Sequence, residues 1–186
     1  MGKITSPFYF FRRTPRPPSP LTAYGAYKLG CDLHARVARH VHGIPTIGLR
    51  PFNVYGPRQD PSSPYSGVIS IFADRMHRAL PITIYGDGEQ QRDFIYVEDA
   101  VKAFLAAMTR LERAKEPAAY EVINLCTGHG TSINQLADTI GHIAGCALPR
   151  NYAPARPGDI RLSVGHPGRL SQQLGLTAGL SLEDGI

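Results

Sequence analysis

The chain has 186 residues, 42% of them hydrophobic, which is enough for one ordinary domain or for part of a larger one. Its formal net charge is +5, but the lysines and arginines are scattered, and this lack of a basic run argues against nucleic acid as a partner. No apolar stretch approaches the ~20 residues of a membrane span, and the three cysteines have neither metal-ligand spacing nor a disulfide pattern, so we expect a cytoplasmic protein without a metal site.

Residues 1–20 are rich in proline and are expected to form an irregular lead-in. The first helix is predicted to begin after Thr22, a residue type that caps helix N-termini, and to end at Gly43, because glycine readily adopts the left-handed conformation. Two faces of this helix carry distinct sets of residues: Leu33, Val37 and Val41 on one, and Tyr24, Lys28, Cys31 and Ala35 on the other. Cys31 and the more distant Cys126 are expected to be small buried side chains.

The segment IPTIGLRPFNVYG is predicted to be a buried strand over residues 46–49 that runs into a loop at Pro51. The segment GPRQDPSSPYSG is predicted to be a loop, and a helical period follows from Val68 to about Leu80. The segment ITIYGDGEQQRDFIYV then predicts two short strands around a Gly-Asp-Gly turn.

A long helix is predicted to start at Asp99, and its expected apolar face consists of Val101, Phe104, Leu105, Met108 and Leu111. After a strand, YEVINLC, the residues Ser132 and Gln135 have the spacing of a capping box at the start of another helix. Short strands and turns follow, with a short helix near PGRLSQQLG, and Ser181 ahead of acidic residues marks a further helix start.

Strands that alternate with helices predict an α/β fold. The glycine-rich patterns G-x-G-x-x-G and G-x-x-G-x-x-G, which bind dinucleotides in such folds, are both absent from the sequence. Because the first predicted helix begins by residue 22, little room precedes it for a nucleotide-binding βαβ unit. We therefore expect the strand at residues 46–49 to expose one edge and the apolar surface beside it.

Tyr24 and Lys28 are candidates for proton transfer. Four residues apart on a helix, they share one face at about 5–6 Å between Cβ atoms. A tyrosine with the ordinary pKa near 10 becomes a base near pH 7 only if its surroundings supply roughly 4 kcal/mol. One ammonium at ~5 Å supplies about 3 kcal/mol of this at an effective dielectric constant of about 20. The same spacing also arises in helices without catalytic roles, and Tyr27 is expected to point elsewhere as a structural residue.

A second set of polar residues lies near the ends of predicted strands, where ligands bind in open α/β sheets. Asn53 follows the first strand, Arg92 precedes another, and Arg156 lies between two prolines. Two guanidinium groups on stiff turns suit a diphosphate, because their planar forks match phosphate oxygens. The alternative is a set of surface ion pairs: Arg92 with Asp93 or Glu89, and Arg156 with Asp159.

Four segments occur in the order and spacing typical of extended short-chain dehydrogenases/reductases: YGAYK, LRPFNVYGPRQDPSSPYSGVI, IYGDGEQQRDFIYVEDAV and ARPGDI. From about residue 14 to its end, the chain resembles the NAD-dependent epimerase/dehydratase family, and most of all its UDP-glucose 4-epimerase group. The resemblance implies the C-terminal part of a Rossmann-like fold with its small substrate-binding lobe, and the absence of the N-terminal dinucleotide-binding half. It places the catalytic helix and strand at about 21–55, with the lobe interleaved over about 56–186.

The resemblance also implies a role for individual residues. Tyr24 is the catalytic base, and Lys28 holds the nicotinamide ribose of NAD. Pro51 and Phe52 are implied to lie against the nicotinamide. The UDP phosphates are implied to contact Asn53, the backbone at Val68, Arg92 and Arg156. The uracil is implied to lie among Thr83, Tyr85 and Asp159.

The activity implied for the complete enzyme, a homodimer, is 4-epimerisation of a UDP-hexose through transient oxidation. The tyrosine removes the sugar 4-hydroxyl proton, hydride passes to NAD, and hydride then returns to the other face of the 4-keto sugar. Two alternatives stay open: a non-catalytic UDP-sugar-binding or dimerisation remnant, and a related nucleotide-sugar dehydratase or decarboxylase. The chain departs from the family pattern in its missing glycine-rich loop and at Tyr27, where relatives more often carry Ser or Asp.

Overall fold

The computed structural model describes residues 20, 22–63, 66–114, 120–147 and 149–186. The expected lead-in therefore lies, apart from residue 20, outside the described residues. The helices are α1 (Ala23–His42), α2 (Val68–His77), α3 (Val97–Arg113), α4 (Ile133–Ile143), α5 (Gly168–Leu174) and α6 (Leu182–Gly185). The strands are β1 (Ile47–Pro51), β2 (Asn53–Tyr55), β3 (Ile82–Tyr85), β4 (Gln91–Arg92), β5 (Phe94–Tyr96), β6 (Glu121–Leu125), β7 (Thr131–Ser132), β8 (Arg150–Ala153) and β9 (Leu162–Ser163).

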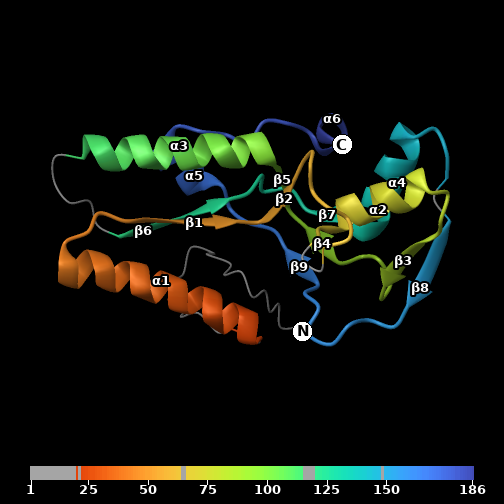
Figure 1. Ribbon diagram of the computed structural model, residues 1–186, viewed down its shortest axis with the longest axis horizontal. Helices are drawn as coiled ribbons and strands as arrows, with labels where there is room; N and C mark the ends of the chain where they lie inside the picture. The colour runs from red at the N-terminus through yellow and green to blue at the C-terminus, as the bar shows by residue number, and fades with distance from the viewer. Residues whose placement is uncertain (1–19, 21, 64–65, 115–119, 148) are drawn as a thin grey trace.

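A layer of two parallel strands, β1 and β6, forms one end of the molecule. Their register sets Ile47 opposite Glu121 and Pro51 opposite Leu125. In Figure 1, α1 and α3 lie on opposite faces of this pair, and α5 contacts both α3 and β6. Helices on both faces of parallel strands are the arrangement of α/β proteins, which confirms the predicted fold class. We call this end of the molecule the β1–β6 layer.

The other end of the molecule is a small lobe of α2, α4, β3 and β8, at the right of Figure 1. Its core contains large aliphatic side chains from several elements, among them Ile82 and Ile84 of β3 and Leu136 and Ile140 of α4, all at most 1% exposed. The short strands β4, β7 and β9 join the lobe to the β1–β6 layer as a three-stranded sheet.

The helix boundaries follow the predicted caps. Thr22 Oγ1 accepts a hydrogen bond from the N–H of Gly25 at 3.1 Å, and Gly43 ends α1 with a φ of 67°. Ser132 and Gln135 form the predicted capping box at α4, and Ser181 caps α6 through the N–H of Asp184. These signals were readable in the sequence because each involves neighbouring residues only.

The prediction of two strands around the Gly-Asp-Gly turn is wrong in its count. Three strands form, and β3 does not pair with either of the other two. β3 is parallel to β8, β5 is parallel to β2, and β4 lies between β7 and β9. The partners come from distant parts of the chain, so local pattern alone does not determine the pairing.

The predicted apolar face of α3 is also wrong. The buried residues of α3 are Ala100, Ala103 and Ala107. The expected face consists instead of half-exposed side chains, which are Val101, Phe104, Leu105 and Met108 at 48–58% exposure. Small alanine side chains let the helix approach the strands closely, and the larger residues are left on its flank. In α1 likewise, Leu33, Val37 and Val41 are at least half exposed.

The two cysteines that were expected to be buried differ in their exposure to solvent. Cys126, at the end of β6, is fully buried, and burial raises the pKa of its thiol to about 12. Cys31 is exposed on α1, so that expectation is wrong. Among the described helices, none is long and apolar enough to cross a membrane.

Candidate functional site

The N-terminal end of α1 and the C-terminal end of β1 enclose a pocket of about 410 Å³. Tyr24, Lys28, Pro51 and Phe52 all line it. Lys28 Nζ lies 5.3 Å from the centroid of the Tyr24 ring, as expected for residues one helical turn apart. The fold thus brings together four residues that the sequence separates into two segments.

Tyr27 does not point away from this pair, contrary to expectation. Lys28 Nζ is 5.9 Å from the centroid of its ring, so the ammonium lies near both tyrosines. The Tyr27 side chain, which we expected to be a structural residue, is 70% exposed and therefore does not pack in the interior. Its closeness to the lysine follows from the length of the flexible lysine side chain.

A buried polar contact fixes α1 against the strands beside the pocket. Asp32, one turn after Lys28, pairs with Arg50 of β1, whose Nε donates at 3.0 Å. The hydroxyl of Tyr120 donates to the other carboxylate oxygen of Asp32 at 3.3 Å. Burial, reinforced by the Asp32 charge, raises the pKa of Tyr120 to about 12, so this phenol stays neutral. We did not predict this contact, because Tyr120 and Asp32 are 88 residues apart.

Asp93 is the centre of the site's hydrogen bonding, and we had considered it only as a partner for Arg92. Its carboxylate is fully buried and accepts from the backbone N–H groups of Thr127, Gly128 and Gly165 at 2.8, 2.9 and 3.1 Å. The Thr127 hydroxyl adds a fourth hydrogen bond at 2.8 Å. A carboxylate is tolerated in such a place only when donors of this kind replace water.

Asp93 also positions two of the predicted ligand-binding residues. Its backbone carbonyl accepts from both the backbone N–H and the side-chain Nδ2 of Asn53, at 3.0 and 2.9 Å. Gly165, held by the Asp93 carboxylate, packs against Phe52 so closely that an added Cβ would lie 2.8 Å from the Phe52 ring. Asp93 therefore connects the pocket on α1 with the strand that carries Arg92.

Arg92 forms its ion pair with Asp159, and not with Asp93 or Glu89 as we had considered. Its Nη2 lies 2.5 Å from Asp159 Oδ1, and its Nη1 donates to the carbonyl of Ile160. Burial lowers the pKa of the Arg92 guanidinium and the Asp159 charge opposes this, but an arginine remains charged at any physiological pH. The side chain is 15% exposed, so the charge lies in a partly dry site.

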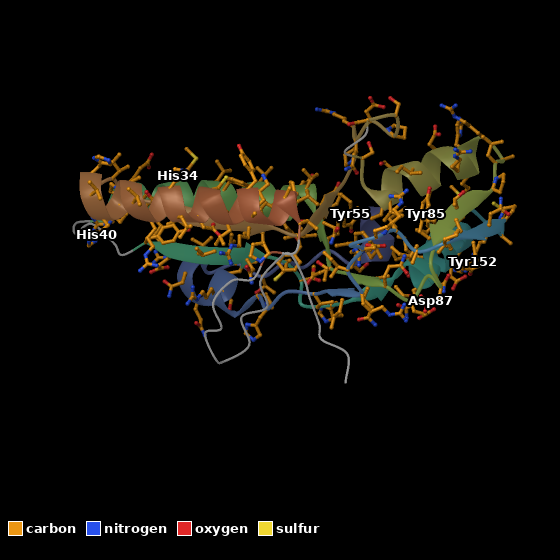
Figure 2. All side chains as sticks on the ribbon, turned by 90° about the horizontal axis from the view of Figure 1, so that it is seen from below. His34, His40, Tyr55, Tyr85, Asp87 and Tyr152 are labelled. Carbon is orange, nitrogen blue, oxygen red and sulfur yellow. The ribbon has the colours of Figure 1, made fainter. Side chains whose placement is uncertain are left out.

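Arg156 stacks on Tyr85, with its guanidinium carbon 3.6 Å from the ring centroid. The expected Arg156–Asp159 pair is absent from the ion pairs of the described residues; the two share only a backbone hydrogen bond across a turn. Tyr85 and Thr83 alternate along β3 with two buried isoleucines, so both lie on its outer face. Figure 2 shows Tyr85 on the lobe, with Tyr152 and Asp87, at the end of the molecule opposite to His40 of α1.

The turn that carries Arg156 and Asp159 lies against the start of α1. Gly158, at its centre, has a φ of 79°, and an added Cβ would lie 3.7 Å from Cγ2 of Thr22. Since Thr22 is the N-cap of the helix that carries Tyr24, the turn with Arg156 and Asp159 lies next to the Tyr24–Lys28 pocket.

Val68 is the first residue of α2. The preceding residue, Gly67, provides no side-chain hydrogen bond to the helix N-terminus. The first backbone N–H groups of a helix without such a cap suit an anion. Among the contacts of the described residues, none joins Val68 or Thr83 to Arg92 or Arg156. The fold therefore places Val68 and Thr83 on the lobe but does not bring them into contact with either arginine.

Comparison with known proteins gives one consistent family. The sequence pattern of the NAD dependent epimerase/dehydratase family matches residues 5–125. The chain is 32% identical over 171 residues to the UDP-glucose 4-epimerase of Mycolicibacterium smegmatis. The aligned region covers 91% of this chain and 52% of the relative. The chain thus spans about half the length of this relative.

Solved structures agree. The UDP-glucose 4-epimerase of Thermotoga maritima, crystallised with UDP-glucose, superimposes with a TM-score of 0.82 at 39% identity, over 90% of this chain and 52% of that one. The UDP-glucuronic acid 4-epimerase of Bacillus cereus, in complex with UDP-glucuronic acid and NAD, gives a TM-score of 0.80 at 31% identity, over 91% and 51%.

Proposed function

Since this chain belongs to the NAD dependent epimerase/dehydratase family, we propose that it is the catalytic helix and nucleotide-sugar-binding lobe of a UDP-hexose 4-epimerase. The N-terminal dinucleotide-binding half of that enzyme lies outside it in this proposal. The observation that carries the proposal is the juxtaposition of two features: the pocket that holds Tyr24 beside Lys28, and the turn that holds Arg156 and Asp159 against the same helix.

The pocket fits the nicotinamide end of NAD, the cofactor of the family. A lysine ammonium beside a tyrosine suits a ribose and a reacting hydroxyl, while Pro51 and Phe52 supply a flat apolar wall. The rest of the dinucleotide has no glycine-rich loop in this sequence to hold its pyrophosphate. Bound in this pocket, NAD would supply the reversible transfer of hydride at C4 of the sugar.

The chain's own residues handle the proton and the charge. Tyr24 accepts the proton of the sugar 4-hydroxyl, and the Lys28 ammonium compensates the negative charge on the tyrosine oxygen. Asn53 is held in one orientation by its hydrogen bonds to the Asp93 carbonyl, which suits a contact with the substrate phosphates.

The two arginines retain donors for a diphosphate. Among the described residues, the hydrogen bonds of Arg92 use Nη1 and one N–H of Nη2, so Nε and the other Nη2 hydrogen have no partner there. Stacking on Tyr85 orients the Arg156 guanidinium and keeps the edge of its plane open. Tyr85 and Thr83, on the outer face of β3, then lie beside the diphosphate in the position for the uracil, with Asp159 on the far side.

The test is calorimetric titration of UDP into the wild-type chain and into Arg92→Ala, Arg156→Ala and Tyr24→Phe. Loss of either arginine should weaken binding roughly ten- to a hundredfold, because a charge-assisted hydrogen bond is lost. Tyr24→Phe should leave UDP affinity within about twofold, since it removes only the hydroxyl used in proton transfer. NAD titrated into the wild-type chain should give no measurable heat.

Arg161→Ala is the matched control. Arg161 is an exposed arginine of the same lobe that pairs with Asp87, so its loss should leave UDP affinity unchanged if Arg92 and Arg156 act specifically. Equal affinities across all variants would remove the arginines from the proposal. Absence of UDP binding to a folded wild-type chain would favour the non-catalytic remnant.

A further inference from the structure

The outer face of the β3–β8 pair carries an asparagine that the proposed function leaves without a role. The two strands are parallel, and their register sets Thr83 opposite Asn151 and Tyr85 opposite Ala153. Residues that lie opposite each other in neighbouring strands, about 4.8 Å apart, point to the same face of the sheet. Asn151 therefore lies directly beside Thr83, on the face proposed for the uracil.

The contacts of the neighbouring residues in β8 agree with this orientation. Arg150 forms an ion pair with Asp138, and the hydroxyl of Tyr152 donates to Oδ1 of Asn134 at 3.0 Å. Both partners belong to α4, so Arg150 and Tyr152 face that helix. Because side chains alternate along a strand, Asn151 between them faces away from α4.

The polar groups on this outer face are available to a ligand. Asn151 and Thr83 are both exposed, and among the hydrogen bonds of the described residues none uses the Asn151 carboxamide or the Thr83 hydroxyl. Tyr85 is fixed beside them, because the Arg156 guanidinium stacks on its ring at 3.6 Å and Gln90 Nε2 donates to its carbonyl at 2.9 Å. The face thus combines an ordered aromatic–guanidinium stack with two polar side chains that no described residue engages.

The spacing of these groups suits a nucleotide. Thr83 and Tyr85 are two residues apart on β3, which is about 6.6 Å along a strand. A diphosphate held by Arg156 over Tyr85 therefore has its nucleoside within reach of Thr83 and Asn151. A carboxamide carries an acceptor oxygen and a donor nitrogen side by side, which complement the adjacent N3–H and O4 of uracil.

We infer that Asn151 binds the hydrogen-bonding edge of the uracil and is a specificity-determining residue for the nucleotide. Its Oδ1 accepts from N3–H and its Nδ2 donates to O4, a two-point contact of the kind that amide side chains make with bases. The inference rests on the proposed function, in which the arginines hold the diphosphate, and it adds the residue that binds the polar edge of the base.

The experiment is calorimetric titration of UDP and of inorganic pyrophosphate into the wild-type chain and Asn151→Leu. Leucine keeps nearly the shape of asparagine but has no hydrogen-bonding group. UDP binding should weaken roughly two- to tenfold, as expected for the loss of neutral hydrogen bonds. Pyrophosphate has no base, so its affinity should stay within about twofold of wild type.

Tyr152→Phe is the matched control. It changes the next residue of the same strand, on the opposite face, and removes a hydroxyl that contacts only α4 among the described residues. Both affinities should stay within about twofold of wild type in this variant. Asn151 and Tyr152 are exposed, so circular dichroism should show both variants folded.

Nuclear magnetic resonance of the side-chain amides gives a second measurement. The Asn151 signal, identified by its absence from Asn151→Leu, should shift when UDP is added and should not shift with pyrophosphate.

Unchanged UDP affinity in Asn151→Leu would overturn the inference and leave the proposed function intact. Equal weakening of UDP and pyrophosphate would also overturn it, because Asn151 would then act on the phosphate site or on the fold. Absence of UDP binding to the folded wild-type chain would overturn the proposed function and this inference together.

Discussion

The lobe and the β1–β6 layer bury their apolar side chains to different extents. In the lobe, Phe72, Ile82, Ile84 and Leu136 meet in one cluster at no more than 3% exposure. In the layer, Ile95, Ile123, Leu125 and Leu170 form a second buried cluster with alanines of α3, while Phe104 and Leu33 stay about half exposed on the helices. Both regions thus enclose a core, and the layer also leaves large apolar side chains exposed on its helices α1 and α3.

The difference corresponds to the division of function that we propose. The residues proposed to bind the diphosphate and the uracil lie on or beside the lobe, where Arg92 pairs with Asp159 and Tyr85 stacks with Arg156. Tyr24 and Lys28 lie on the layer. In this proposal, UDP binding depends on the lobe and proton transfer on the layer.

The largest effect expected from a single substitution is in the lobe core. Leu136→Ala should destabilise the chain by about 2–5 kcal/mol, because it leaves a cavity among fully buried neighbours. Leu105→Ala, at an exposed position of α3, should change stability by less than about 0.5 kcal/mol. Urea denaturation of both variants measures the difference, and similar losses would contradict the contrast between the two positions.

The next effect is at Asp93, which joins the two regions. Asp93→Asn keeps the shape of the side chain, but its NH₂ group faces N–H donors and the charge-assisted hydrogen bonds are lost, for a cost of about 1.5–3 kcal/mol. The control is Asp87→Asn at an exposed carboxylate, where denaturation should show almost no change.

The smallest effect is a pH dependence shared by both regions. Burial raises the pKa of Tyr120 in the layer and of Tyr55 beside the lobe, each from 10.0 to about 12. The folded state therefore holds protons that the unfolded state releases between these values, so the contribution of these two tyrosines to stability is constant below pH 10 and falls as pH rises toward 12. Tyr120→Phe or Tyr55→Phe should each reduce this decline.

Denaturation midpoints measured across the alkaline range, with phenolate absorbance as the direct record of ionisation, check this expectation. Tyr152→Phe provides a control, because Tyr152 is 56% exposed. An unchanged slope in all three variants would contradict the burial argument.

The sequence by itself determined the features that depend on neighbouring residues. The caps at Thr22, Gly43 and Ser132 are local hydrogen bonds or backbone conformations, so residue type and spacing suffice to predict them. The alternation of strands and helices gave the fold class, and the four motif segments gave the family. The roles of the individual site residues stay predictions, because they concern a bound substrate.

Tertiary structure decided everything that depends on contacts between distant segments. The partner of Arg92 is Asp159, 67 residues away, and the donors to Asp93 come from two loops that follow it in the chain by 34 to 72 residues. The burial of alanines rather than larger side chains on α3 depends on how closely that helix approaches the strands. Helical periodicity shows that a face is apolar, but the neighbouring layer selects which side chains are covered, since burial is a property of packing between elements.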